Sequence, residues 1–481
     1  PATPQMAWRK RPMHDDIAWM PATEMAAAIR SKTLSPVEVA RAFLERIAAI
    51  NPSLNAYCLV TPEMAMAAAK DAEAAVMRGD ALGALHGVPV SIKDLFDVKG
   101  LPTTKGSLLY KDKIADGWEY CAKRLIDAGG VHLGKTNTPE FGFIPMTENR
   151  IFGATKNPWD LACTPGGSSG GAAAAVAAGL GPIALSSDGG GSLRIPASFC
   201  GVFGIKPTYG RVPRKPGGWT TMTHRGPTTR TVADAALALD VMAGYEPEDP
   251  FSVRDYPGSF LGEVDLGVEG LRVAWSADLG YAPVEPEVRA ICEAAAKRFA
   301  DLGCTVEEAS PGIANPAADL TFLTVAATAD ATWLGELSAN ELALLDEPAR
   351  TFLEFGKRTT GMDLIKAEKR RMVMWQTMRR FHETYDLLLT PVLSCAAFPI
   401  GQQPTVIAGQ ELPPFGWMPY TQPFNLTGQP AASVPCGFDA RGMPVGLHIV
   451  GRAYEDSLVL RAARAFEQAQ PWAAKRPPMA V

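Results

Sequence analysis

Apolar and polar positions alternate along the chain with periods that predict both helices and strands. Between positions 40 and 47 the apolar residues recur at the spacing of one helical face. They follow Ser35-Pro36-Val37-Glu38, a capping pattern with proline at the first helical position. Asn51-Pro52 predicts the end of this helix.

Two strand patterns follow, with a helix between them. Residues 88–94 predict a short strand that places Ser91 and Lys93 on one face and apolar side chains on the other. A helix near 118–128 ends at a pair of glycines and leads into a second strand over 131–135. This alternation of helix and strand indicates an α/β sheet.

The second half of the chain repeats the α/β pattern and then becomes helical. Residues 271–307 predict a strand, a helix and a strand, and residues 316–385 predict a long helical stretch. Between 391 and 435, nine prolines are interleaved with aromatic residues, which predicts an ordered, functional loop system and not a linker. A last amphipathic helix is expected after Asp456.

Composition and charge narrow the classes of partner. Hydrophobic residues make up 47% of the 481 residues and charged residues 20%, which excludes extensive disorder. The formal net charge of −5, without a basic block, argues against nucleic-acid binding. The longest apolar run, residues 172–185, is interrupted and too short for a membrane span.

The cysteines and histidines indicate the redox environment of the protein and whether a metal site is expected. The eight cysteines are scattered singly, which predicts free thiols in a reducing cytoplasm, and no signal-peptide pattern is found near Pro21 and Glu24. The six histidines show no ligand-like spacing. We therefore expect a cytoplasmic protein with no metal and no cofactor.

Candidate chemistry concentrates in one glycine-rich segment, because twelve of the 45 glycines lie in residues 161–210. A phosphate-binding loop is not favoured, since Ala172-Ala173 stand where lysine and Ser/Thr are needed. Residues 166–170 match the serine-hydrolase elbow, but the residues before them predict a loop and not the required strand. Nothing singles out His382 or His448 as the histidine of such a triad.

A third interpretation uses two serines and a lysine. Ser168 would lie at the N-terminus of an all-apolar helix over Ala172–Ala178, and Ser192 on a glycine loop beyond it. Successive glycines let backbone N–H groups converge on one point, as an oxyanion hole requires. The base would be a lysine that burial keeps neutral, and on chemistry alone Lys93 and Lys135 both qualify.

Several longer motifs surround these residues. They are Gly166-Gly-Ser-Ser-Gly-Gly171, Asp188-Gly-Gly-Gly-Ser-Leu-Arg-Ile-Pro-Ala197, Phe199-Cys-Gly-Val-Phe-Gly-Ile-Lys-Pro-Thr208, Val90-Ser-Ile-Lys93-Asp94, Gly134-Lys-Thr-Asn137, Asn157-Pro-Trp159 and Tyr420-Thr-Gln-Pro-Phe-Asn425. Together they resemble the amidase signature family over about residues 30–470.

The resemblance implies a fold and a domain organisation. The fold is a single large α/β/α sandwich, with a central mixed β-sheet covered by helices. One domain is expected over residues 1–481. Within it, residues 1–75 would form an N-terminal helical region, residues 76–245 the signature core with the catalytic residues, and residues 246–481 a C-terminal part with substrate-lining loops.

The resemblance also implies catalytic roles for the positions that match the motifs of the family. Ser192 would be the acyl-forming nucleophile, Ser168 the bridging serine that follows a cis peptide bond, and Lys93 the base. The oxyanion hole would be formed by the backbone N–H groups of Gly189, Gly190, Gly191 and Ser192.

Two features beside the nucleophile carry further expectations. Asp188 and Arg194 are interpreted as an ion pair that organises the loop and not as direct catalysts. Position 189 is glycine, where the family commonly has Thr or a larger residue, so we expect a roomier or more mobile acyl site.

The substrate pocket is expected from segments 141–146, 209–225 and 415–425. The candidate lining residues are Gly142, Phe143, Ile144, Met146, Trp219, Phe415, Trp417 and Phe424. An apolar, aromatic pocket suits aryl and alkyl amides, anilides, esters and carbamates. The resemblance to aryl acylamidases and urethanases fits this expectation.

The expected activity is hydrolysis of amide C–N bonds, extending to carbamates, with a small-molecule substrate, no nucleic acid and no membrane. A homodimer is left open. Two other functions also stay open from the sequence. One is the glutaminase subunit of a tRNA-dependent amidotransferase, which would need charged pocket residues and a partner chain. The other is a catalytically silent scaffold protein.

Overall fold

A computed structural model describes residues 14–215, 221–254 and 258–480 of the chain. Its centre is an 11-stranded mixed sheet with the order β1-β3-β2-β4-β6-β5-β12-β13-β9-β7-β8. The strands are β1 (Tyr57–Val60), β2 (Pro89–Lys93), β3 (Val131–Thr136), β4 (Ile183–Asp188), β5 (Phe203–Lys206), β6 (His224–Thr229), β7 (Arg272–Trp275), β8 (Thr305–Glu308), β9 (Leu387–Pro391), β12 (Ala431–Phe438) and β13 (Pro444–Gly451). A separate hairpin pairs β10 (Val406–Ile407) with β11 (Gln410–Glu411).

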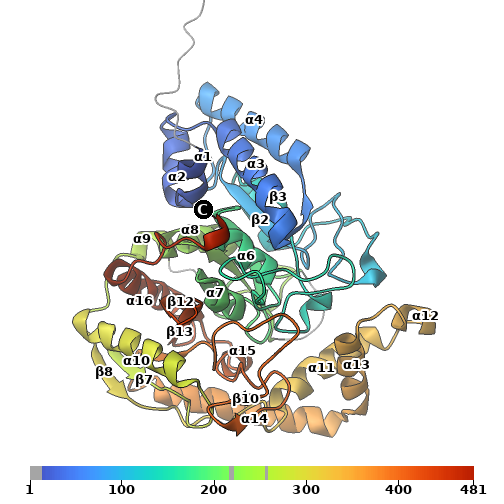
Figure 1. The fold of residues 1–481 in the computed structure, drawn as a ribbon, viewed down its shortest axis with the longest axis vertical. Helices are drawn as coiled ribbons and strands as arrows, with labels where there is room; N and C mark the ends of the chain where they lie inside the picture. Colours follow the sequence, from blue (N-terminus) through green and yellow to red (C-terminus); the bar gives the residue numbers. More distant parts are fainter. Residues whose placement is uncertain (1–13, 216–220, 255–257, 481) are drawn as a thin grey trace, which may run out of the picture.

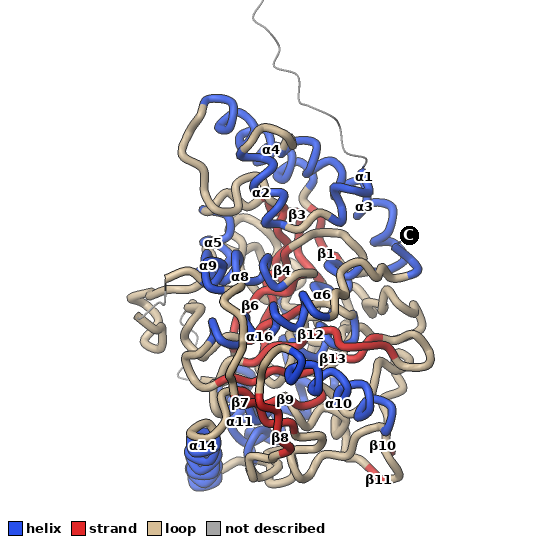
Figure 2. The backbone as a smooth tube through the Cα atoms, turned by 90° about the vertical axis from the view of Figure 1, so that its left-hand side faces the viewer, coloured by secondary structure: helices blue, strands red, loops and turns tan. Residues whose placement is uncertain are grey.

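Helices lie on both sides of the sheet, as Figure 2 shows. They are α1 (His14–Trp19), α2 (Ala22–Arg30), α3 (Pro36–Leu54), α4 (Pro62–Arg78), α5 (Tyr120–Asp127), α6 (Gly170–Ala177), α7 (Arg194–Cys200), α8 (Val232–Met242), α9 (Phe260–Glu263), α10 (Pro286–Asp301), α11 (Thr321–Leu334), α12 (Ala339–Leu342), α13 (Glu347–Arg358), α14 (Gly361–Phe381), α15 (Gln422–Leu426) and α16 (Asp456–Ala469). The N-terminal helices α1–α4 gather at one end of the molecule, and α11–α14 gather at the other (Figure 1). The α/β sandwich expected from the sequence is confirmed.

The sheet is mixed because two parallel groups are joined by antiparallel strands. β2 runs parallel to β3 and β4, and β7 runs parallel to β8 and β9. Between these groups β6, β5, β12 and β13 pair in antiparallel fashion. Parallel β2 and β4 end at the same edge of the sheet, so Lys93 and Asp188, their last residues, face one region.

Helix α3 confirms the predicted capping pattern at its start but runs further than predicted. Ser35 Oγ accepts hydrogen bonds from the backbone N–H groups of Val37 and Glu38, at 3.1 and 3.2 Å. α3 continues through Pro52 to Leu54. It ends there because Asn55 adopts a left-handed conformation, with φ of 56°.

The long helical stretch predicted over 316–385 is divided into four helices, α11 to α14. Ser338 and Thr360 both form complete capping boxes, which start α12 and α14. Each capping box gives the first N–H groups of a helix side-chain partners, and it therefore favours a new helix over continuation of the old one.

The proline-rich segment contains a central strand that the sequence did not predict. β12 begins at Ala431 and is buried along most of its length. Its proline at position 435 lies where the register with β13 shifts, between Pro435 and Gly437. A bulge of this kind tolerates a residue that has no N–H to donate, so proline does not end the strand.

Two composition-based expectations can be compared with the structure. All eight cysteines are free thiols. Within the described ranges, no helix is long and apolar enough to cross a membrane.

Candidate active site

The candidate base is the last residue of a central strand. Lys93 ends β2, and its side chain is fully buried. Lys93 Nζ lies 2.7 Å from Ser168 Oγ, 2.9 Å from Ser169 Oγ and 3.0 Å from Ser187 Oγ. Burial lowers the pKa of Lys93 well below its usual range, against an opposing effect of the Asp188 charge.

The hydrogen bonds around Lys93 are compatible with proton transfer from Ser168 when the lysine is neutral. The Ser169 hydroxyl donates to the Ser187 carbonyl, at 3.1 Å, so Lys93 Nζ must donate to Ser169 Oγ. A neutral amine has two N–H groups and one lone pair, and with Ser187 Oγ as the second acceptor, at 3.0 Å, both donors are used. The lone pair can then accept the Ser168 proton.

Lys135 is engaged elsewhere. Its Nζ lies 2.9 Å from Asp94 Oδ1 in a buried ion pair and also donates to Thr103 Oγ1, at 3.1 Å. Both side chains of the ion pair are almost fully inaccessible to solvent. Chemistry alone left Lys93 and Lys135 as alternatives, and only Lys93 contacts the serines.

Ser168 precedes α6, the buried helix that the sequence predicted. The Gly167–Ser168 peptide bond is cis. The backbone N–H of Ser169 donates to the carbonyl of Ser192, at 2.9 Å. This bond joins the start of α6 to the glycine loop after β4, so the two serine segments lie side by side.

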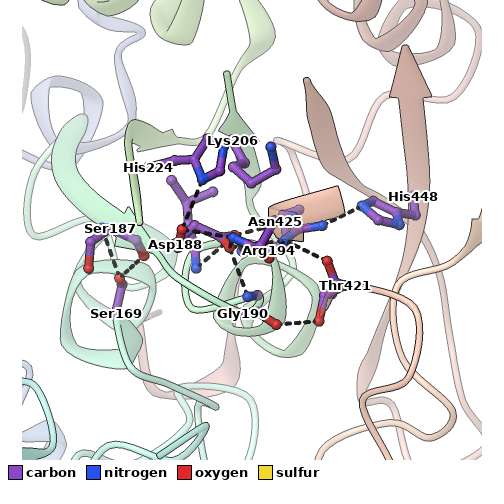
Figure 3. Close-up of polar contacts among 12 residues, drawn as sticks. Ser169, Ser187, Asp188, Gly190, Arg194, Lys206, His224, Thr421, Asn425 and His448 are labelled. Atoms are coloured by element: carbon purple, nitrogen blue, oxygen red, sulfur yellow. Dashed lines mark hydrogen bonds and ion pairs between the residues drawn. The ribbon is translucent and has the colours of Figure 1, made fainter. Parts of the chain in front are cut away.

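The glycine loop is organised by a buried carboxylate, which Figure 3 shows at the centre of a polar network. Asp188 forms a bidentate ion pair with Arg194, with distances of 2.9 Å to both carboxylate oxygens. Burial alone would raise the pKa of Asp188, but the Arg194 charge and its hydrogen bonds hold this pKa well below the usual range. The interpretation of Asp188 and Arg194 as a structural pair fits these contacts.

Two residues of the proline-rich segment, Thr421 and Asn425, hold the same loop through hydrogen bonds. Thr421 Oγ1 donates to the Gly190 carbonyl, at 2.6 Å. Asn425 Nδ2 donates to the backbone carbonyl and to Oδ1 of Asp188, both at 2.9 Å. His448 contacts Arg194 Nη1 at 3.1 Å, on the side of the network opposite Ser169 and Ser187 (Figure 3).

The structure differs from the expected oxyanion hole at one position. The Gly191 N–H donates to Asp188 Oδ1, at 2.8 Å, and is therefore already satisfied. Gly189, Gly190 and Ser192 line the cavity, and Gly191 does not. Three donor residues remain candidates: Gly189, Gly190 and Ser192.

A cavity of about 960 Å³ opens in front of both serines. Four of the predicted pocket residues line it: Gly142, Phe143, Ile144 and Phe415. Trp219 lies outside the described residues, but its neighbours Thr221 and Met222 line the cavity. All three predicted segments thus contribute to the wall.

Three other predicted pocket residues do not line the cavity. Trp417 is buried in the core, where its ring stacks on Phe199 at 5.6 Å between centroids. Phe424 is fully buried and packs edge-on against His448. Met146 lies behind the loop, where its backbone approaches Gly167. These corrections share one cause, because aromatic and apolar side chains in a loop also serve as core anchors.

One wall of the cavity was missed from the sequence. It comes from α11, α13 and α14, including Phe322, Asp330, Trp333, Phe352 and Arg371. The signal that could have indicated α11 is a carboxylate, Asp330, within an otherwise uncharged helix of sequence TFLTVAATADATWL.

Comparison with known proteins shows the family of the chain. A family model described as Amidase matches residues 38–460. The chain belongs to the amidase family. It is 44% identical over 468 residues to a protein named acylamidase of Rhodococcus erythropolis, which covers 96% of this chain and 98% of that protein. It is 37% identical to one of the subunits of a glutamyl-tRNA(Gln) amidotransferase of Moorella thermoacetica, over 97% of this chain and 100% of that protein.

Solved structures of the amidase family share the fold. The crystal structure of a bacterial aryl acylamidase of the amidase signature enzymes superposes with a TM-score of 0.91 at 32% identity, over 95% of this chain and 98% of that one. A 6-aminohexanoate cyclic dimer hydrolase superposes with a TM-score of 0.86 at 32% identity, over 96% and 100%. The chain is thus an amidase signature hydrolase, an enzyme that cleaves amides of small molecules.

Proposed function

We propose that this amidase cleaves the C–N bond of aryl and alkyl amides through an acyl-enzyme on Ser192. The observation that carries the proposal is the 2.7 Å contact between Lys93 Nζ and Ser168 Oγ, at the edge of a cavity that both Ser168 and Ser192 line. Lys93 is the base, and Ser168 passes the proton between the base and the nucleophile.

The proposed reaction begins when Ser192 Oγ attacks the substrate carbonyl. The Ser192 proton passes to Ser168 Oγ as the Ser168 proton passes to Lys93 Nζ. The backbone N–H groups of Gly189, Gly190 and Ser192 bind the oxyanion. Collapse of the tetrahedral intermediate breaks the C–N bond, and Ser168 protonates the leaving nitrogen while Lys93 returns its proton to Ser168. Water then hydrolyses the ester by the same relay.

The lining of the cavity supports aryl and alkyl substrates. Phe141 and Trp333 meet edge-on with centroids 4.9 Å apart, and Phe143 stacks on Phe352 at 5.1 Å. Such walls bind apolar groups through their area and aromatic groups through ring contacts. We extend the proposal to carbamates and esters, because both present a carbonyl to the same nucleophile.

A hydrolysis panel tests this substrate class. We expect the purified chain to cleave neutral anilides and alkyl amides, carbamates and esters, and to leave free glutamine intact. Product formation for each compound is measured by chromatography. Hydrolysis of glutamine without cleavage of any anilide would overturn the proposal in favour of the amidotransferase function.

Glycine at position 189 provides a test of the acyl site. A Cβ added to Gly189 would meet only Thr223 Oγ1, at 3.3 Å, whereas a Cβ on Gly190 would lie 2.6 Å from Phe322 Cζ. Gly189→Thr is therefore expected to fold and to narrow the cavity. We expect kcat/KM for bulky acyl groups to fall by about tenfold or more relative to acetyl amides.

The comparison of acyl groups is made as a ratio within each variant, which cancels differences in the active fraction. Gly190→Ala serves as a contrast, since its Cβ must displace the Phe322 ring. An unchanged ratio in Gly189→Thr would contradict the roomy acyl site.

A further inference from the structure

The cavity wall contains one carboxylate without a close partner. Asp330 lies on α11 and is half-buried, so its side chain is reached from the cavity. Within the described residues its one hydrogen-bond donor is the Trp333 indole N–H, at 3.5 Å from Asp330 Oδ1, which is at the limit for such a bond. An ionised carboxylate has about four acceptor sites, and most of this capacity is unused.

The surroundings make an unpaired carboxylate costly. Burial raises the pKa of Asp330 to about 6, because the neighbouring side chains offer little stabilisation of its charge. Trp333 lies beside it, and the ring of Phe141 packs edge-on against Trp333. Desolvating a carboxylate without partners opposes folding, so packing alone gives no reason for an acid at this position.

The other charged groups of this wall are already paired. On α14, Arg371 Nη1 lies 3.5 Å from Glu368 Oε1. Arg371 also donates to the carbonyls of Leu426 and Thr221, at 2.6 and 3.0 Å. Among the described lining residues, Asp330 is thus the carboxylate without a cationic side chain beside it.

Helix α11 separates this carboxylate from the glycine loop. The Phe322 ring reaches the glycine loop, since a Cβ on Gly190 would lie 2.6 Å from its Cζ. Phe322, Ala326, Ala329, Asp330 and Trp333 all line the cavity, which makes them one continuous helical face. At 1.5 Å rise per residue, Asp330 lies about 12 Å further along the helix axis than Phe322, the residue whose ring reaches the glycine loop.

We propose that Asp330 forms a cation subsite, which binds a protonated primary amine that the substrate carries remote from its scissile amide. The proposal rests on the proposed function, because it assumes that cleavage occurs at Ser192. The amine supplies the hydrogen bonds that Asp330 lacks, and the Trp333 and Phe141 rings provide faces for a cation. Asp330 thereby selects amides with a remote amine over apolar amides of the same length.

Two matched substrate pairs test the subsite from both sides of the scissile bond. On the acyl side, the para-nitroanilide of an octanoyl chain with a terminal amine is compared with nonanoyl para-nitroanilide. On the leaving side, monoacetylated octanediamine is compared with N-nonylacetamide. The enzymes are the full-length wild type, Asp330→Asn, and Glu336→Gln, which removes an exposed carboxylate outside the cavity.

We expect Asp330→Asn to lower kcat/KM at least about tenfold for one amine-bearing substrate, mainly through KM, as loss of a charged hydrogen bond predicts. Its methyl-ended partner should change by less than about twofold, and Glu336→Gln should change neither. Equal effects on both members of each pair, or none on either, would overturn the subsite.

The two proposals fail in different ways. Wild-type cleavage of the methyl-ended substrates, lost in Ser192→Ala, supports the proposed function whatever Asp330 does. If the wild type cleaves neither pair and Ser192 resists acylating reagents, both proposals are wrong.

Discussion

Replacing Ser192 by alanine is expected to lower kcat for amide hydrolysis on the order of 10⁴–10⁶-fold. Without the hydroxyl no acyl-enzyme can form, and the remaining rate would come from the loop N–H groups and the cavity alone. A sulfonyl fluoride should label the wild type at Ser192 and leave Ser192→Ala unlabelled. Intact-protein mass spectrometry and a chromatographic amide assay measure the two effects.

A second serine provides the control for this experiment. Ser198 is buried on α7 and does not line the cavity, so Ser198→Ala should keep both labelling and activity. Wild-type protein that resists labelling and cleaves no amide would favour the silent scaffold instead. Activity retained by Ser192→Ala would assign the nucleophile to another residue.

The sequence predicted the elements around this chemistry because they depend on local patterns. The alternating strand over 88–94 is confirmed as β2, and the all-apolar helix after Ser168 is confirmed as α6. The Asp188–Arg194 ion pair is likewise confirmed. Each of these features is specified within a few residues, by strand alternation, by a run of small apolar side chains or by a charged pair six positions apart.

Features that depend on individual side-chain contacts could not be predicted from periodic patterns. Residue chemistry alone left Lys93 and Lys135 open as the base, and the family resemblance selected Lys93; the structure adds that Asp94 and Thr103 hold Lys135 in contacts of its own. The Gly191 N–H is taken by Asp188, which folds back over its own loop. No periodicity in either segment reports such a contact.

The sequence also did not show which apolar residues line the cavity. Trp417 and Phe322 are both large apolar residues, yet one packs in the core and the other contacts Gly190 at the cavity. Which of them faces the substrate depends on how α11 and the proline-rich loop pack on the sheet. Sequence patterns indicate whether a side chain prefers to be buried, but they do not indicate which residues it packs against.

Replacing Lys93 by methionine is expected to lower kcat about 10²–10⁴-fold, the usual contribution of a general base. Methionine has a similar length and no charge, so the buried site keeps its packing and the chain should stay folded, as circular dichroism would show. The substitution removes the acceptor for the Ser168 proton and leaves both cavity serines in place.

The pH profile separates this role from a structural one. Protonated Lys93 cannot accept a proton, so wild-type kcat/KM should fall as the pH drops through the Lys93 pKa. Burial lowers that pKa, so the limb should lie well below the usual range for lysine. In Lys93→Met this limb should disappear, while Lys99→Ala, which changes an exposed lysine, should retain it. An acid limb that survives in Lys93→Met would show that another group is the base, since the only ionisable atom removed is Lys93 Nζ.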